Sequence, residues 1–447
     1  MSSAIKTGSN IAGRNGVVIS KREYNSERSG YRSYEVHQRE RVGESTEKIK
    51  PTQLISQDYR IDPYPLLKTL RENYPCYRDW LSNSYWVTRY NDVTSIFSDD
   101  ANFETRSKSW LYGLEGLGRN LGNELAVLTA QEAKIDAHAG LIAIDLAKQL
   151  ASVGTGDLAN GFAAKFARNL LGVTYGIPTG DIPEFGARYW RSQRGISWKP
   201  ELQRDGKKAI HELIEYFEPI VAEREQNPGD DMISAMVGLE QPANAKDIVV
   251  TLLEGDHETL HGALANLWYL LLNNPNEFEK ARSDKRLMKL AYLETLRHST
   301  PVISSQRFSR HEVERFGKLI PEGARIICSA AAANRDPRIF QDPDKFIVDR
   351  KDMCQREPRG QYRADGLATG ITFGLGKPST HPAVPEDRPR SLYAITRDAA
   401  VLASEILVGH LDDIAIASET WPKLASLTVG EMHTCWKLPV TFKPKNL

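Results

Sequence analysis

The sequence contains few cysteines and no long run of apolar residues. Its four cysteines are Cys76, Cys328, Cys354 and Cys435, and none belongs to a C-x-x-C pattern or a Cys/His cluster. This scatter argues against a disulfide framework and against a structural zinc site, so we expect a protein of the reducing cytoplasm. No window approaches about 18 consecutive apolar residues, and the N-terminus lacks a basic-then-apolar signal pattern, so we expect no membrane span and no secretion.

The chain also lacks net charge. Its 58 Lys and Arg residues balance 58 Asp and Glu residues, so no overall field attracts nucleic acid or an anionic membrane. Hydrophobic residues make up 40% of the chain, including 8 Trp, 17 Tyr and 13 Phe. This apolar content is enough to build a core, and it argues against a largely disordered protein. We therefore expect a folded protein without a nucleic-acid partner.

Residues 1–55 differ from the rest of the chain. Gly, Ser, Arg and Glu dominate this stretch, which has ten Lys or Arg residues against six Asp or Glu and no apolar periodicity. Such a composition predicts a flexible, mildly basic arm. Between Arg28 and His37 the arm interleaves tyrosines with arginines, residue types that are enriched at interface hot spots. We expect the arm to be either a docking segment for a protein partner or an unstructured tail.

Residues 56–447 are predicted to form one mainly helical domain. The apolar patterns in this part predict helices over 66–73, 91–99, 124–153, 158–174, 206–225, 244–274, 286–298 and 391–408. Strand-like runs occur at 84–89, 301–308, 325–329 and from Lys437 to the end of the chain. The stretch 244–274 is apolar on most of its surface, so we expect one long helix through the middle of the molecule, ended by Pro275.

Several segments, taken in order, are similar to those of one known family. Residues 62–65 and 85–93 resemble the opening helix and strand of the cytochrome P450 superfamily, and Gly255 to Thr259 resembles the acid–threonine pair of its central helix. Glu294 and Arg297 stand where that family has its E-x-x-R pair, with Arg350 as the third member of a structural triad. The i, i+3 spacing places Glu294 and Arg297 on one helix face. The resemblance implies a cytochrome P450-like fold, mainly α with a small β-sheet region.

The same resemblance fails at the haem ligand. A haem-thiolate enzyme needs a cysteine beneath the iron, because electron donation from the thiolate favours cleavage of the oxygen–oxygen bond. The family presents this cysteine in an F-G-x-G-x-[HR]-x-C-x-G loop, whereas residues 373–382 place Thr380 in the cysteine position, followed by His381. No cysteine lies between Cys354 and Cys435. Haem bound in the usual thiolate mode is therefore not expected.

Other haem contacts of the family are missing as well. The basic residues that grip the haem propionates align with Ala133 and Ala137, and Pro378 replaces the basic residue of the loop. Only Arg307 keeps a charge of the propionate-binding type. At about 1.5 to 3 kcal/mol for each lost charged hydrogen bond, several kcal/mol of haem affinity should be missing. A histidine or tyrosine ligand such as His381 or Tyr393 is the alternative that keeps haem.

A second constellation offers a metal site. Residues 257–261 read H-E-x-x-H, which on a helix brings two imidazoles to one face with a glutamate as general base. Glu254 adds a carboxylate, so that E-x-x-H occurs twice, a spacing that suits zinc or non-haem iron. We consider a site built from Glu254, His257, Glu258 and His261, beside the alternative that these side chains are hydrogen-bonded packing residues.

Two classes of function stay open. The first is an auxiliary or scaffold protein that lacks monooxygenase chemistry and binds a protein partner through the arm. The second is an enzyme, either a haem oxygenase with a non-cysteine ligand or a catalyst using the helix metal site. In an active relative of the family, Glu258 and Thr259 would deliver protons. The stretches 103–122 and 175–200, where the family shapes its substrate pocket, are rich in aromatic residues, which favours an apolar small-molecule ligand.

Overall fold

The computed structural model describes residues 10–12, 18–20, 49–97, 99–114, 116–197, 199–255, 257–352, 389–390, 392–417, 424–427 and 432–445. These residues belong to two compact units that alternate along the sequence. The first unit draws on Met1–Arg106 and Val302–Pro343, and the second draws on Ser107–Pro301, Asp344–Thr369 and Pro382–Leu447. The arm boundary expected near residue 55 stays a prediction, because most of residues 1–48 lie outside the described part.

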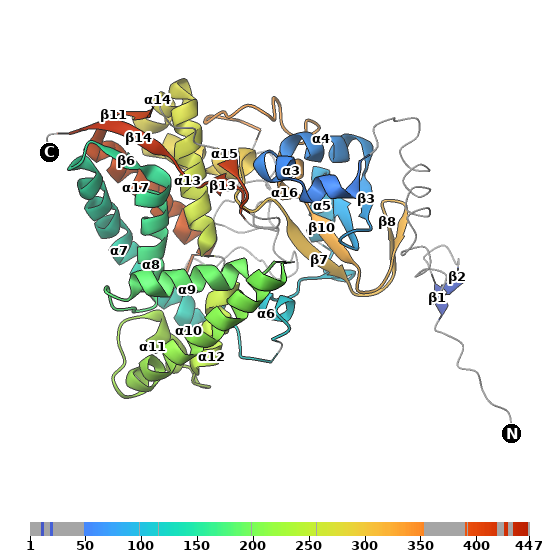
Figure 1. Ribbon diagram of the computed structural model, residues 1–447, viewed down its shortest axis with the longest axis horizontal. Coiled ribbons are helices and arrows are strands. Elements are labelled where there is room, and N and C mark those ends of the chain that lie inside the picture. The colour runs from blue at the N-terminus through green and yellow to red at the C-terminus, as the bar shows by residue number, and fades with distance from the viewer. Residues whose placement is uncertain are drawn as a thin grey trace. The chain divides into compact units, whose positions relative to one another are not determined.

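The first unit is built around a five-stranded sheet with the order β3-β4-β10-β7-β5 (Figure 1). Strand β10 pairs in parallel with β4, and the other neighbours are antiparallel. The strands of the first unit, inside and outside this sheet, are β1 (Asn10–Ala12), β2 (Val18–Ser20), β3 (Cys76–Asp79), β4 (Ser84–Val87), β5 (Phe103–Glu104), β7 (Ser305–Ser309), β8 (Val313–Arg315), β9 (Lys318–Ile320) and β10 (Arg325–Cys328). Its helices are η1 (Pro51–Ile55), α3 (Gln57–Ile61), α4 (Tyr64–Asn73), α5 (Tyr90–Phe97) and α16 (Ala330–Ala333).

The second unit is mainly helical. Helix α7 lies against α17 and α8, and α9 lies against α10 (Figure 1). Its helices are α6 (Lys108–Leu111), α7 (Leu125–Ala151), the π-helix η2 (Leu158–Ala164), α8 (Lys165–Thr174), α9 (Ile182–Arg194), α10 (Pro200–Gln226), α11 (Met232–Val237), α12 (Ala245–Glu254), α13 (Glu258–Asn273), α14 (Pro275–Ser283), α15 (Lys285–His298) and α17 (Leu392–His410). Its strands are β6 (Thr155–Asp157), β11 (Leu411–Ile416), β12 (Leu424–Ala425), β13 (Thr434–Cys435) and β14 (Pro439–Pro444).

Apolar side chains form the core of each unit. In the first unit Leu67, Leu70 and Ala331 are fully buried in one cluster. In the second unit the largest side chains of the α9–α12 core are aromatic, and Phe185 and Phe217 are fully buried. Each buried side chain of this size contributes about 1.5 to 3 kcal/mol relative to an exposed one. The predicted class, mainly α with a small β-sheet region, is confirmed.

The prediction of one continuous helix over 244–274 is wrong in one respect, because the structure divides this stretch into two helices, α12 and α13. Helix α12 ends at Glu254 and α13 begins at Glu258. At this break the carbonyl of Leu253 accepts a hydrogen bond from the side-chain amide of Gln193, at 3.2 Å. A contact from another helix thus reaches the backbone where Gly255, a poor helix former, weakens the helix.

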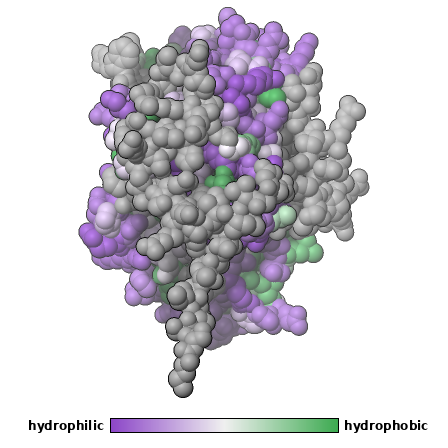
Figure 2. Space-filling view, turned by 90° about the vertical axis from the view of Figure 1, so that its right-hand side faces the viewer, coloured by the Kyte–Doolittle hydropathy of each residue, from purple (hydrophilic) through white to green (hydrophobic). Residues whose placement is uncertain are grey.

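No helix in the described ranges is long and apolar enough to cross a membrane. On the face drawn in Figure 2 the described residues are mainly hydrophilic, and the hydrophobic ones lie in small separate groups. Leu125, Leu141 and Val153 are among the exposed large hydrophobic side chains of the second unit. Single exposed side chains of this kind are normal on a folded protein and mark no site by themselves.

Candidate functional site

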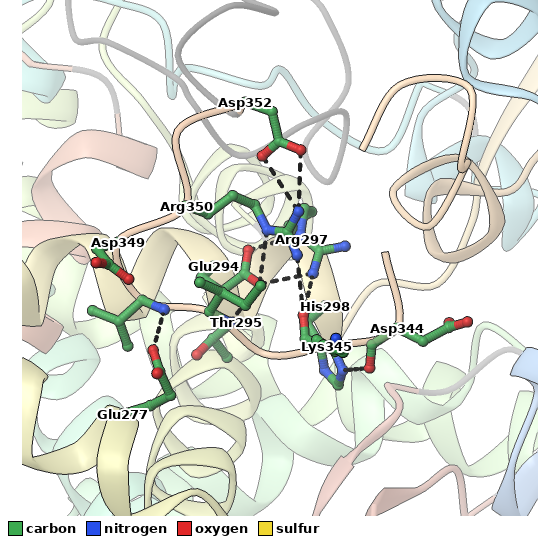
Figure 3. A network of polar contacts seen from close by, with 12 residues as sticks. Glu277, Glu294, Thr295, Arg297, His298, Asp344, Lys345, Asp349, Arg350 and Asp352 are labelled. Atoms are coloured by element: carbon green, nitrogen blue, oxygen red, sulfur yellow. Dashed lines mark hydrogen bonds and ion pairs between the residues drawn. The ribbon is translucent and has the colours of Figure 1, made fainter. Parts of the chain in front are cut away.

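The structure brings Glu294, Arg297 and Arg350 together in a buried network (Figure 3). Glu294 and Arg297 share one face of α15, and the Arg297 guanidinium donates two hydrogen bonds of 2.7 Å to the Glu294 carboxylate. Arg350 approaches the same carboxylate at 3.2 Å and also pairs with Asp352 at 3.1 Å. Each guanidinium therefore faces a carboxylate, as burial of these charges requires.

The same network fixes the backbone of residues 345–350, which belong to the second unit. Both guanidinium groups donate to the carbonyl of Lys345, at 3.0 Å from Arg297 and 3.2 Å from Arg350. The amide of Ile347 donates to Glu294 at 3.0 Å (Figure 3). Residues 345–350 have no helix or strand of their own, so these side chains supply the backbone partners that a regular element would supply. This arrangement positions a loop, and its charges are already paired.

The break between α12 and α13 gathers polar side chains from four helices of the second unit. Glu254, the last residue of α12, accepts hydrogen bonds from the backbone amides of Lys108 and Ser109, each at 3.1 Å. Glu258, the first residue of α13, pairs with Lys108 at 3.3 Å and accepts a hydrogen bond from the hydroxyl of Tyr189. The Glu254 carboxylate is thus held by α6, and the Glu258 carboxylate is held by side chains of α6 and α9.

The two histidines of the H-E-x-x-H stretch are held in aromatic surroundings. The ring of His257 packs edge-on against Tyr175 and Tyr189. The ring of His261 packs edge-on against Trp190 and Trp436, with centroids 6.1 and 5.7 Å away, and the two tryptophan rings also contact each other. Burial in this apolar environment lowers the pKa of His261 to about 4, so its imidazole is neutral at pH 7. Its Nε2 atom is buried without a hydrogen-bond partner.

The metal site considered from the sequence is not assembled. Among the residues that the structure describes, no group of three or more His, Cys, Asp or Glu side chains could hold a metal ion. The expectation assumed one continuous helix, on which Glu254, His257, Glu258 and His261 would cluster. The helix break separates Glu254 from the other three, and its carboxylate is occupied by the backbone amides of α6. Thr259 follows Glu258 on α13 and is buried.

The aromatic residues of the stretches 103–122 and 175–200 partly fill the core. Tyr112 and Tyr189 are 4% and 5% exposed and belong to the apolar cluster of α9–α12. The Tyr112 hydroxyl donates to the backbone carbonyl of Ser192. These two rings are therefore packing residues, while the polar ends of their side chains tie neighbouring segments together.

Arg307 lies in the first unit, on β7. Its guanidinium stacks on the ring of Phe97 at 4.5 Å and donates to the carbonyl of Gln306 at 2.9 Å. Burial lowers the pKa of Arg307. Within the described part of the chain these contacts are to a ring and a carbonyl and not to a carboxylate, so the guanidinium fits an acidic ligand. The other haem-slot residues, Thr380 and His381, lie outside the described residues, as does the side chain of Tyr393.

The three described cysteines, Cys76, Cys328 and Cys435, are buried. Burial raises the pKa of Cys328 and of Cys435 to about 12. The Cys435 thiol donates a hydrogen bond to the carbonyl of Lys437 at 3.3 Å. Since the thiolate and not the thiol binds metals, these side chains do not fit an iron ligand. Cys354 lies outside the described residues.

Helix α7 carries alanines where the resembled family has its basic residues. Ala133 and Ala137 are exposed on α7. Their neighbours Glu132 and Asp136 both bind Arg390, at 2.5 Å each. Burial alone would lower the pKa of Arg390, but these carboxylates and Asp398 raise it. On α7, acidic side chains therefore bind Arg390, a basic residue of the same chain.

Sequence reasoning missed Lys108, Tyr189, Gln193 and Arg390. None belongs to a recognisable motif, and each makes its contact across at least 60 residues of chain, as in the hydrogen bonds from Gln193 to Leu253 and from Arg390 to Glu132. The amphipathic pattern of 182–194 would have indicated α9, but not which of its side chains faces Glu258.

Comparisons with known proteins agree on one family. The family model described as "Cytochrome P450" matches residues 195–356. The chain is 28% identical over 353 residues to pulcherriminic acid synthase of Bacillus subtilis (strain 168), a match that covers 74% of this chain and 86% of that protein. It is also 28% identical over 244 residues to 6-deoxyerythronolide B hydroxylase of Saccharopolyspora erythraea, covering 53% of this chain and 57% of that protein.

Solved structures show the same fold. The structure of P450BioI in complex with an acyl carrier protein ligated to hexadec-9Z-enoic acid superposes with a TM-score of 0.70. The match is 21% identical in sequence and covers 87% of this chain and 99% of that chain. A likeness at this identity concerns the arrangement of helices and strands, while function depends on the site residues.

Proposed function

The chain belongs to the cytochrome P450 superfamily, and from this premise we propose that it keeps the fold without haem-thiolate catalysis and serves as an auxiliary partner of another protein. The observation that carries the proposal is the lack of a ligand: between Cys354 and Cys435 the sequence has no cysteine. A thiolate is the group that drives oxygen–oxygen cleavage in this family's chemistry. Thr380, in the cysteine position, supplies no such donor.

The residues present fit the propionates of a haem poorly as well. Arg307 offers one half-buried cation, which among the described residues contacts a carbonyl and a ring. Ala133 and Ala137 offer none, and their helix binds Arg390 through Glu132 and Asp136 instead. A charged hydrogen bond contributes about 1.5 to 3 kcal/mol, so loss of two cations weakens haem binding by several orders of magnitude. The cysteine ligand and two propionate-binding cations are missing together. This combination favours a change of function over the effect of one isolated substitution.

The carboxylate of the acid–threonine pair is also engaged elsewhere. Glu258 pairs with Lys108 and with the Tyr189 hydroxyl. In an active member of the family, Glu258 and Thr259 would deliver protons to bound oxygen. With its oxygens taken by two side chains from other helices, Glu258 serves packing here, in agreement with a protein that has left this chemistry.

A protein partner is supported by two features. The arm, residues 1–55, is basic and carries tyrosines and arginines, the composition favoured at interfaces. A structural neighbour, P450BioI, was solved in complex with an acyl carrier protein, so this fold accepts a protein partner. We place the complex in the reducing cytoplasm, because the few cysteines of the sequence are scattered and form no disulfide framework. We also propose that an apolar small molecule is the substrate on which the partner protein acts.

The haem part of the proposal is tested by spectroscopy and metal analysis of the full chain. The protein is purified from cells grown with a haem precursor and then titrated with haemin. We expect no Soret band with thiolate character, no carbon monoxide shift, and no stoichiometric zinc or iron. A thiolate-type carbon monoxide spectrum would refute the proposal. A Soret band without that shift would indicate haem held by another ligand such as His381, and bound zinc or iron without haem would indicate a metal enzyme.

The partner is tested with a C-terminal tag, which leaves the arm unchanged. The full chain and a variant lacking residues 1–48 are recovered from the cells that naturally express the protein, and co-purifying proteins are quantified by mass spectrometry. We expect a defined partner with the full chain and its loss with the truncated chain. Equal recovery in both samples would remove the arm from the proposal, and recovery of no partner at all would remove the auxiliary role.

A further inference from the structure

Two carboxylates of α7 lie one turn apart on the same face of the helix. Glu132 and Asp136 have the spacing i, i+4, and their side chains are 25% and 56% exposed. Two like charges at this spacing repel each other and destabilise a helix. Lys134, which lies between them in the sequence, pairs with Asp230 instead, at 2.9 Å. The cation that offsets this repulsion therefore has to come from another part of the chain.

Arg390 supplies that cation from the start of α17. It precedes Leu392, the first residue of the helix. Its guanidinium donates to Glu132 and to Asp136, each at 2.5 Å, and its backbone amide donates to Glu132 at 3.4 Å. The side chain and the backbone of one residue thus tie the chain that enters α17 to α7, and the two helices lie side by side (Figure 1).

A third carboxylate completes the cluster from α17 itself. Asp398 accepts from Arg390 and from Arg397, each at 2.9 Å. Burial alone would raise the pKa of Asp398, but the hydrogen bonds and charges of Arg397 and Arg390 lower it, so this carboxylate is ionised at pH 7. Three carboxylates from two helices therefore surround one guanidinium, which links α7 to the first turns of α17.

This cluster is open to solvent, unlike the network around Glu294. The Arg390 side chain is 34% exposed, whereas those of Arg350 and Glu294 are 2% and 0% exposed. At 1 M salt the Debye length falls to about 3 Å, so dissolved ions weaken an exposed ion pair much more than a buried one. Ionic strength should therefore loosen the contacts of Arg390 and leave those of Arg350 intact.

We propose that Arg390 is a salt-sensitive clamp that fastens the start of α17 to α7. At low ionic strength its guanidinium holds Glu132, Asp136 and Asp398 together, and the first turns of α17 stay closed against α7. At high ionic strength these contacts weaken, and this end of α17 loosens while the rest of the helix stays packed. The clamp consists of residues of this chain alone, so the inference does not rest on the proposed function.

Hydrogen–deuterium exchange of the full-length protein tests the clamp at about 0.1 M and about 1 M sodium chloride. In the wild type we expect the amides of 396–400 to exchange about tenfold faster at the higher concentration. The amides of 404–408, where Ser404 and Leu407 are fully buried, should keep their rates. In Arg390→Met the amides of 396–400 should exchange at the faster rate at both salt concentrations.

A second substitution separates charge from packing. Arg390→Met leaves Glu132 and Asp136 repelling each other, so the addition of Glu132→Gln should restore part of the protection of 396–400. Loss of packing alone predicts no recovery, and its absence would overturn the clamp. Arg191→Met is the matched control, because Arg191 also binds two carboxylates and is 31% exposed, but lies on α9. It should leave the exchange of 396–400 unchanged.

Three further results would overturn the clamp. The first is unchanged exchange of 396–400 both in the wild type at high salt and in Arg390→Met. The second is an equal salt response in the wild type and in Arg390→Met, since salt would then act at another place. The third is equally faster exchange of 404–408, which would report general loosening of α17.

Discussion

The guanidinium of Arg297 donates two hydrogen bonds to the carboxylate of Glu294, each 2.7 Å long, and neither side chain is exposed to solvent. The residues are one turn apart on α15, so the helix itself sets the approach of the two groups. Arg350 and the backbone amide of Ile347 complete the surroundings of the carboxylate. The pair is therefore a fixed point from which the loop 345–350 is positioned.

Replacing Arg297 with alanine is expected to destabilise the protein by about 3 to 5 kcal/mol, because it leaves a buried carboxylate with one cation fewer. Urea unfolding followed by circular dichroism measures the loss. Arg282→Ala is the matched control, since Arg282 pairs with Glu279 at the same i, i+3 spacing on α14 but is 42% exposed. This control should cost less than about 1 kcal/mol, and equal losses in both variants would contradict the expectation.

Asp247→Asn is expected to lower the free energy of unfolding by about 1 to 3 kcal/mol at pH 7. Asp247 is buried near the start of α12 and accepts from Arg119 at 2.8 Å and from the Asn244 amide at 3.1 Å. Burial alone would raise its pKa, but hydrogen bonds from Arg119 and Asn244 outweigh burial and lower the pKa. Its contribution is thus present above the unfolded pKa, about 3.9, and is lost as pH falls below it.

Unfolding of wild type and Asp247→Asn at pH 7 and at low pH checks this expectation. The difference between the two proteins should shrink as the carboxyl group of Asp247 becomes protonated. Asp230→Asn is the control, because Asp230 is 91% exposed in its pair with Lys134. A stability difference between wild type and Asp247→Asn that persists unchanged at low pH would show that charge is not what the site requires.

His261→Phe is expected to remove part of the pH dependence of stability. The folded pKa of His261 is about 4 and the unfolded value is about 6.5, so the unfolded chain binds the extra proton between these values and stability rises with pH across this window. Between pH 7 and pH 5 the wild type should therefore lose about 2 kcal/mol more than the variant. Urea unfolding at both pH values measures it. An exposed histidine, replaced in His211→Phe, should keep the wild-type behaviour, and an identical pH response of His261→Phe would refute the assignment.

Thr380→Cys alone is expected to give little haem-thiolate absorption after titration with haemin. The cysteine restores the ligand, but Ala133 and Ala137 still supply no cation for the propionates. Adding Ala133→His and Ala137→Arg to Thr380→Cys should raise haem affinity at least about tenfold, given about 1.5 to 3 kcal/mol for each charged hydrogen bond. If the single variant binds haem as tightly as the triple variant, the missing cations are not what separates this chain from its active relatives.

The sequence predicted regular elements well where an apolar pattern recurs over many turns. Helices α7, α15 and α17 lie close to their predicted bounds, and α10 begins six residues earlier than the predicted 206, because the periodic burial that stabilises them is visible in the residues themselves. The sequence pattern did not predict the break after Glu254. The carbonyl of Leu253 is bound by Gln193 from α9, and a contact between residues 60 positions apart leaves no periodic signal. Helix α9 lies within the stretch 175–200, for which a pocket-forming role and no helix is predicted, although its residues have an amphipathic pattern.

The residue types of this chain determine by themselves that residues 373–382 contain no cysteine, that Glu294 and Arg297 share a helix face, and that apolar helices dominate. These are properties of identity and local spacing. Only the tertiary structure decided that the Glu254 carboxylate contacts α6, that the Glu258 carboxylate contacts α6 and α9, and that His261 is neutral beside two tryptophans. The partner of a charge and the dielectric around it depend on side chains brought in from distant parts of the chain, which no local pattern records.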